Sequence, residues 1–151
     1  MADTPIEDAL SIAGTVCVVF LLLSQLPTLF LIYKRKLTVA DVSVLPSLGQ
    51  GANFVTWVLY GIASDTPAIL RVNVIGCAFA LVYILFFLSY SVGANRRQIV
   101  AQLTGTITLI GIVVGIIFAA IPETAARADA LGWVAVSCNV LMLAAPLAAC
   151  L

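Results

Sequence analysis

Five long stretches of the chain contain no charged residue, and short charged segments separate them. They cover residues 9–33, 42–64, 72–95, 98–122 and 130–151. A helix needs about 20 consecutive apolar residues to cross the roughly 30 Å hydrocarbon core of a bilayer. Each stretch is apolar on all sides rather than along one face, which is typical of a membrane span and not of a surface helix. The pattern therefore predicts five transmembrane helices.

The connections between these stretches are short, so we expect successive helices to be neighbours in one bundle. They cover residues 34–41, 65–71, 96–97 and 123–129. The first and third connections hold most of the basic residues, namely Lys34, Arg35, Lys36, Arg96 and Arg97. Because Lys and Arg are enriched in cytoplasmic loops, these two connections should face the cytoplasm. The N-terminus should then lie outside the cell or in a lumen.

Composition agrees with the bilayer as the main solvent, because 63% of the residues are hydrophobic and only 9% are charged. Soluble domains are about half apolar and about a quarter charged. The formal net charge is +0, and the chain has no basic surface pattern of the kind that holds nucleic acid, so we expect no nucleic-acid partner. Histidine is absent, and the four cysteines lie in apolar stretches without CxxC spacing. We therefore expect no metal and no cofactor.

The spans also contain prolines and side-chain amides at membrane depth. These are Pro27, Pro46, Pro146, Gln25, Gln50, Asn53, Asn73, Gln102 and Asn139. Such groups are costly in lipid unless they face the bundle interior or a wet cavity, so together they indicate a polar pathway. For any one amide, a simple bond to a neighbouring helix, worth about 1 kcal/mol, explains its presence equally well.

Several motifs in the first 90 residues resemble those of the SWEET (saliva-type) family of sugar transporters. Residues 24–28 read SQLPT and residues 34–38 read KRKLT, similar to the family's SPxxT and KxKST. Pro46 opens the next span. Further on the chain carries the patterns N-x-x-x-W-x-x-Y-G from Asn53 to Gly61 and N-x-x-G-x-x-x-x-x-x-Y from Asn73 to Tyr83.

The resemblance implies an all-α membrane protein built around a three-helix SWEET or SemiSWEET-like repeat over residues 1–95. A linker transmembrane helix should follow over residues 96–122. Residues 123–151 should hold one helix of an incomplete second repeat, because Asn139, Met142 and the APL of residues 145–147 resemble the family's N-x-x-M-x-x-S-P-L. Full members have seven helices, so we expect a chain truncated after the fifth helix.

The resemblance also implies which residues bind sugar. Asn73, Trp57 and Asn53 are the candidates, because an amide both donates and accepts hydrogen bonds and an indole offers apolar surface to the C–H faces of a sugar. Without the motif, Trp57 would be expected in the aromatic belt at the membrane surface. Tyr60 and Asp65 fall where the family builds its outer gate, although Asp65 could equally be a loop charge that ends a helix.

The resemblance further implies that prolines in the first two helices of each repeat act as hinges on the cytoplasmic side. Pro46 and Pro146 align with this set. Gln25 stands where the first-helix proline would be, and Pro27 follows two residues later. Two residues correspond to about 200° around a helix, so Pro27 cannot occupy the same face. The form of the hinge in the first span is therefore open.

The leading functional hypothesis is passive uniport of mono- or disaccharides by alternating access, in the plasma membrane rather than an internal one. The sequence has no GxxxxGK[ST] nucleotide motif and no carboxylate within a span for proton coupling. It also lacks the nucleophile–base pairs and paired carboxylates that an intramembrane enzyme would need, so we expect no enzyme. A non-transporting, truncated subunit that assembles with itself or with a full-length relative is the alternative. The expected partners are sugar, the lipid bilayer and a second copy of the chain, while a PQ-loop amino-acid carrier would need a Pro-Gln dipeptide that is absent.

Overall fold

All regular structure in the described part of the chain is helical. The computed structural model describes the backbone of residues 5–35 and 37–148, and the side chains of residues 12–140 except positions 17, 21 and 36. The elements are α1 (Pro5–Leu23), α2 (Leu26–Tyr33), the short 3-10 turn η1 (Val39–Asp41), α3 (Leu45–Ala63), α4 (Pro67–Tyr90), α5 (Gly93–Ala120) and α6 (Thr124–Ala148). The expected all-α fold is confirmed.

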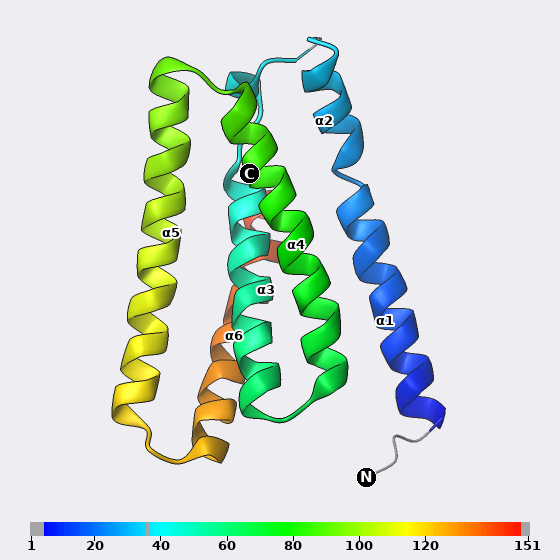
Figure 1. Cartoon of the computed structure of the whole chain (residues 1–151), viewed down its shortest axis with the longest axis vertical. Coiled ribbons are helices and arrows are strands. Elements are labelled where there is room, and N and C mark those ends of the chain that lie inside the picture. Colours follow the sequence, from blue (N-terminus) through cyan, green and yellow to red (C-terminus); the bar gives the residue numbers. More distant parts are fainter. Residues whose placement is uncertain (1–4, 36, 149–151) are drawn as a thin grey trace.

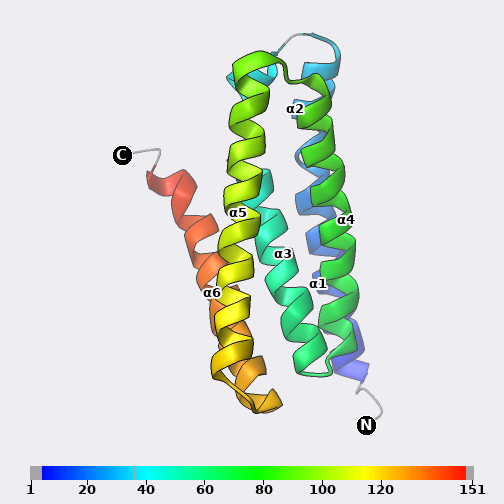
Figure 2. The ribbon, with the colours of Figure 1, turned by 60° about the vertical axis from the view of Figure 1, so that its left-hand side comes forward.

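The helices run up and down along one long axis, with α3 in the middle (Figure 1). α3 packs against α4 on one side and α6 on the other, while α1 lies against α4. α6 crosses α3 at an angle, and α5 runs alongside (Figure 2). The connection of residues 34–44 and the turn between α4 and α5 share one end of the bundle. The other two turns lie at the opposite end, as alternating spans require.

The first predicted span is two helices rather than one. α1 ends at Leu23 and α2 begins at Leu26, with a turn at Ser24 and Gln25 between them. Pro27 sits in the first turn of α2. Its nitrogen carries no hydrogen, so it cannot complete the helical bond to the carbonyl of Leu23 four residues earlier. The proline therefore gives a local reason for the break.

Three of the predicted connections lie partly or wholly inside helices, which corrects their boundaries. α4 begins at Pro67, so Arg71 belongs to the helix. Arg96 and Arg97 lie in the first two turns of α5, since the chain turns at residues 91–92 and Gly93 has a φ of 57° that suits glycine. Arg127 and Asp129 likewise lie within α6. Charged side chains mark where a helix reaches water, but the backbone can stay helical beyond that point.

The end of α3 is fixed by its backbone. Asp65 adopts a φ of 50°, and the Thr66 N–H reaches back to the Gly61 carbonyl at 2.9 Å. This left-handed residue and backward bond are the usual way of satisfying the last carbonyls of a helix. Arg35, with a φ of 55°, is likewise a left-handed residue just after α2. Asp65 therefore lies in the turn that ends α3.

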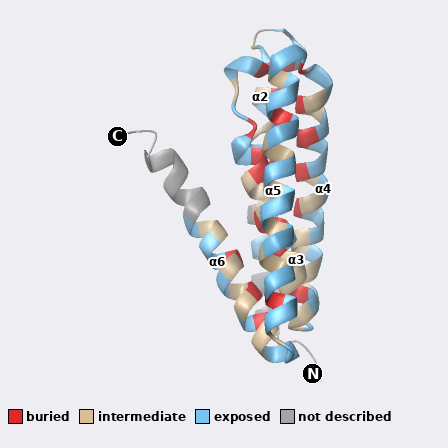
Figure 3. Ribbon diagram, turned by 90° about the vertical axis from the view of Figure 1, so that its left-hand side faces the viewer, coloured by how far each residue is buried: buried red, intermediate tan, exposed pale blue. Residues whose placement is uncertain are grey.

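Close packing between α3 and α4 gives the bundle its core. A Cβ placed on Gly76 would lie 2.5 Å from the ring of Phe54, so only glycine fits there. Buried side chains line this contact and its extension toward α2, whereas α5 is mostly exposed (Figure 3). By length and composition, two helices of the described part, α4 and α5, could cross a membrane on their own. Because α3 packs against both α4 and α6, it is packed on two sides. The candidate site lies along this helix.

Candidate functional site between α3 and α6

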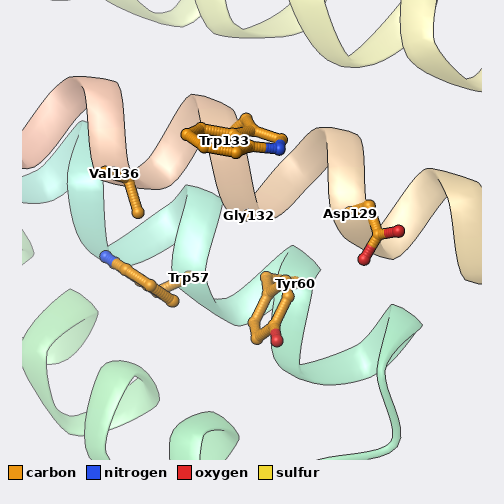
Figure 4. Close-up of a pocket in the computed structure, with 6 residues that line it drawn as sticks. All are labelled: Trp57, Tyr60, Asp129, Gly132, Trp133 and Val136. Carbon is orange, nitrogen blue, oxygen red and sulfur yellow. The ribbon is translucent and has the colours of Figure 1, made fainter.

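A pocket of about 250 Å³ opens between α3 and α6, near the end of the bundle that holds the turn after α3 (Figure 4). It is lined by Trp57, Tyr60, Asp129, Gly132, Trp133 and Val136. Its volume lies somewhat below the roughly 300–1,000 Å³ of sites for drug-sized ligands. The space suits a small ligand that meets aromatic rings from both helices.

The α3 side of the pocket is aromatic. The rings of Trp57 and Tyr60 meet edge to face, with centroids 5.5 Å apart and planes at 85°. A Cβ on Gly132 would lie 3.1 Å from the Tyr60 ring, so this glycine lets the tyrosine lie close to α6. Of the two predicted gate residues, Tyr60 lines the pocket, whereas Asp65 lies in the turn beyond α3.

The α6 side adds Asp129 and Trp133, which the sequence analysis did not select. They are four residues apart and share one helix face. Trp133 is 73% exposed and Asp129 is exposed as well. An ionised carboxylate accepts hydrogen bonds from hydroxyl groups, and an indole face covers C–H groups. Their four-residue spacing on one helix face is the sequence signal for this pair, but the charge of Asp129 places it in a connection when charges are taken to end the spans.

Asn53 lies one helical turn deeper than Trp57 along α3. Its side chain is 8% exposed, and its Oδ1 atom is buried without a hydrogen-bond partner. Its backbone carbonyl accepts the Thr56 hydroxyl at 2.8 Å. A buried acceptor left unpaired costs about 1–3 kcal/mol, so such atoms are rare in folded proteins. This oxygen is suited to accept a hydroxyl from a ligand.

Asn73 lies on α4 and is not among the residues that line this pocket. Its Nδ2 donates to the Ile69 carbonyl at 2.8 Å, one turn earlier on the same helix. It sits between Leu70 and Gly76, two positions where α4 contacts α3, so it faces α3 and is half-buried. The structure brings Trp57 and Tyr60 together but does not place Asn73 in the same pocket.

The predicted hinge residues fall at helix starts and at the break in the first span. The Gln25 Nε2 donates to the Gln50 Oε1, and the Ser47 hydroxyl donates to the Gln25 Oε1 at 3.2 Å. Pro46 occupies the first turn of α3. Pro146 lies in α6 but outside the part of the chain whose side chains are described. Gln25 is thus tied to α3 by side-chain bonds that no proline could make.

Known sugar transporters are similar to this chain in sequence. A family described as "Sugar efflux transporter for intercellular exchange" matches residues 8–95. The bidirectional sugar transporter SWEET4 of Oryza sativa subsp. japonica is 30% identical over 145 residues, which cover 94% of this chain and 56% of that protein. The SWEET4 of Arabidopsis thaliana is 33% identical over 105 residues, covering 68% of this chain and 41% of that protein.

A solved eukaryotic SWEET transporter has a similar fold. The TM-score is 0.81 at 27% sequence identity, and the match covers 93% of this chain and 66% of that one. The chain spans about half the length of the curated relatives it matches. The family match extends over more than half of the residues and includes α1 to α4 almost completely. The chain belongs to the SWEET (MtN3/saliva) family of sugar transporters.

Proposed function

We propose that this chain forms part of the path by which a membrane facilitator passes mono- or disaccharides passively, in either direction, by alternating access. The pocket between α3 and α6, with tryptophans from both helices and one carboxylate, is the observation that carries this proposal. Relatives are named bidirectional sugar transporters, which fits movement without energy coupling. Members of the family are sugar transporters and not enzymes.

Each side chain in and near the pocket has a proposed role. Trp57 and Trp133 stack on the C–H faces of the sugar, and Asp129 accepts bonds from its hydroxyls. The buried Oδ1 of Asn53 accepts a hydroxyl once the sugar moves deeper, which removes the cost of leaving it unpaired. Tyr60 acts as a gate at the pocket. In this scheme Asn73 binds sugar only after its amide leaves the Ile69 carbonyl.

The proposed organisation keeps the repeat assignment made from the sequence. Residues 1–95 form one three-helix repeat, residues 96–122 a linker helix, and residues 123–151 the opening of a second repeat. The protein lies in the plasma membrane. Its N-terminus is outside the cell, and the two basic connections are in the cytoplasm. A second copy of the chain packs beside the first. The mostly exposed apolar surface of α5 supports an arrangement in which other helices cover it.

The test measures sugar flux. The full-length protein is reconstituted into liposomes, and efflux of labelled glucose or sucrose is followed for the wild type, Trp57→Ala and Asn73→Ala. Losing the indole should slow efflux about fivefold, since ring stacking is worth about 1 kcal/mol and a tenfold change corresponds to about 1.4 kcal/mol. Asn73→Ala should abolish flux without reducing insertion, because removing an amide from a span does not disfavour it.

Phe20→Ala provides the matched control, since Phe20 is 70% exposed on α1 and lies outside the pocket. It removes aromatic surface without touching the proposed path, so its flux should equal that of the wild type. Unaltered efflux from well-inserted Trp57→Ala and Asn73→Ala proteins would contradict the proposed path.

A further inference from the structure

The hydrogen-bond ladder of the first span is interrupted over a few residues between α1 and α2. The Ser24 N–H still reaches the Phe20 carbonyl at 3.0 Å, but the Gln25 N–H closes a tighter turn on the Leu22 carbonyl at 3.3 Å. The Leu29 N–H then reaches the Gln25 carbonyl at 3.4 Å. Backbone groups near such a break need partners from elsewhere in the bundle, because lipid offers none.

Tyr83 of α4 supplies one such partner. Its hydroxyl donates to the Leu22 carbonyl, and both residues are almost completely buried, at 1% and 0% exposure. A carbonyl oxygen has two lone pairs, so it can accept both this hydroxyl and the Gln25 N–H. The two residues are 61 positions apart. The tyrosine therefore ties α4 to the first span at the very place where that span is broken.

Gln25 ties the same turn to α3. Its side chain donates to Gln50 and accepts from Ser47, two residues in the first two turns of α3. The break is thus held from two sides, by Tyr83 on α4 and by Gln25 on α3. All of these groups are neutral, so the bonds can open without leaving a charge in the bilayer.

We propose that Tyr83 and Gln25 are positioning residues for transport, whose hydrogen bonds hold the break between α1 and α2 in one geometry. α2 has only eight residues and leads to the basic connection, so a change of angle at the break moves that end of the span. These bonds must open and re-form whenever α2 changes its angle. This inference rests on the proposed alternating-access function.

The test compares backbone exchange in the full-length protein in lipid nanodiscs. Hydrogen–deuterium exchange is followed by mass spectrometry for Tyr83→Phe and Gln25→Leu, each of which removes one of the ties. Losing a hydrogen bond of ordinary net strength should speed exchange in peptides covering residues 22–29 by about two- to tenfold. Peptides of α5 should exchange as in the wild type. The maximal rate of sugar efflux should change, while the sugar concentration at half-maximal rate should not.

Matched controls are available on the same and a neighbouring helix. Tyr90→Phe removes a hydroxyl from an exposed tyrosine of α4, and Gln98→Leu removes an amide from an exposed position of α5. Neither should alter exchange at the break. Gln25→Leu keeps the test decisive if Tyr83→Phe folds poorly, because the two ties come from different helices.

The outcomes separate this inference from the function on which it rests. Wild-type exchange at residues 22–29 in both folded variants would overturn it, as would faster exchange with unchanged flux. Faster exchange with an altered maximal rate supports it. If the wild type moves no sugar, the proposed function fails, whereas the exchange data still decide whether the two ties hold the break.

Discussion

α4 and α5 are alike in sequence character and unlike in their surroundings. Both are long enough and apolar enough to cross a membrane, and the most apolar stretches of the two helices have the same mean hydropathy. In the most apolar stretch of each helix, 22% of α4 is buried against 6% of α5. Figure 3 shows the exposed colour along most of α5. Hydropathy thus identifies a helix that can enter lipid but does not identify the neighbours against which it packs.

Placement of small residues accounts for the difference. Lipid tails are as apolar as leucine, so helices in a bilayer associate through close packing rather than through a hydrophobic driving force. On α4, Gly76 receives the ring of Phe54, and Ala80 lies 3.5 Å from where a Cβ on Gly51 would be. On α5, Gly111 and Gly115 have open space where a side chain would go. Glycines alone therefore do not make an interface unless a partner occupies the space.

α5 is instead held near its two ends. Ile99 and Ile117, which lie near opposite ends of the helix, are its buried side chains among the described residues. Arg127 of α6 donates from Nε to the Ile121 carbonyl, just beyond α5, and its guanidinium lies 5.1 Å from the Phe118 ring centroid. The cation thus sits at a helix C-terminus, where positive charge is favoured.

The largest expected effect on stability comes from adding one methyl group to α4 and, in a separate variant, to α5. Gly76→Ala would press a Cβ against Phe54, a ring that is 5% exposed and cannot move freely. Overpacking costs about 1–3 kcal/mol, whereas alanine gains up to about 1 kcal/mol over glycine within a helix. Gly111→Ala meets nothing and should keep only that gain. The thermal unfolding midpoint in one detergent should therefore fall for Gly76→Ala and stay level or rise for Gly111→Ala.

Equal midpoints for the two alanine variants would remove the basis of the comparison, because α4 would then be no more tightly packed than α5. The double variant should show the sum of the two shifts, since no contact joins the two sites.

A smaller effect on stability is expected from removing the Arg127 contacts at the C-terminal end of α5. Arg127→Gln removes the cation that bonds the Ile121 carbonyl and covers Phe118, so it should destabilise the protein by about 1 kcal/mol. Arg96→Gln, at an exposed position near the other end of α5, is the control and should change little. Thermal unfolding of both variants measures this. If they unfold at the same temperature, α5 is not held through Arg127.

Sequence reasoning reached the helical class and the motif residues of α3, because spacing within one helix is local. Asn53, Trp57 and Tyr60 differ by about one turn each, so their nearness follows from helix geometry alone. The partners of Trp57 and Tyr60 did not follow, since Asp129 and Trp133 line the same pocket only through the angle between α3 and α6.

The helix boundaries and the geometry of the hinge were harder to predict from the sequence than the helical class, for a different reason. Charged residues were used to end spans, but proline at position 67 and glycine at position 93 set where the helices begin. The open question about Gln25 could not be answered from the chain, because its bonds reach residues 22 and 25 positions away. The partners of Gln25 lie on α3, so they are known only once the packing of the first span against α3 is known.

The smallest expected effect concerns the connections that lead into α3 and α5. Before α3, Asp41 accepts the Thr38 hydroxyl at 2.7 Å and the Thr38 N–H at 2.9 Å, whereas α5 starts after Val92 without a side-chain cap. The hydroxyl bond first, and the N–H bond second, lower the pKa of Asp41 below its ordinary value of 3.8. Its stabilising contribution is therefore present above that value and is lost as pH falls through the lower, folded pKa.

Asp41→Asn mimics the protonated carboxyl, so it isolates this contribution. The wild type should unfold at a slightly higher temperature than Asp41→Asn from neutral pH down to about pH 5, with a constant gap. The gap should close only as the pH falls below the ordinary pKa, because the wild-type side chain then becomes neutral as well. Asp41 is fully exposed, so the gap should be the smallest of the effects described. Paired thermal unfolding from pH 7 to pH 3 measures it, and a gap that persists unchanged to pH 3 would mean that the charge of Asp41 has no part in holding the turn before α3.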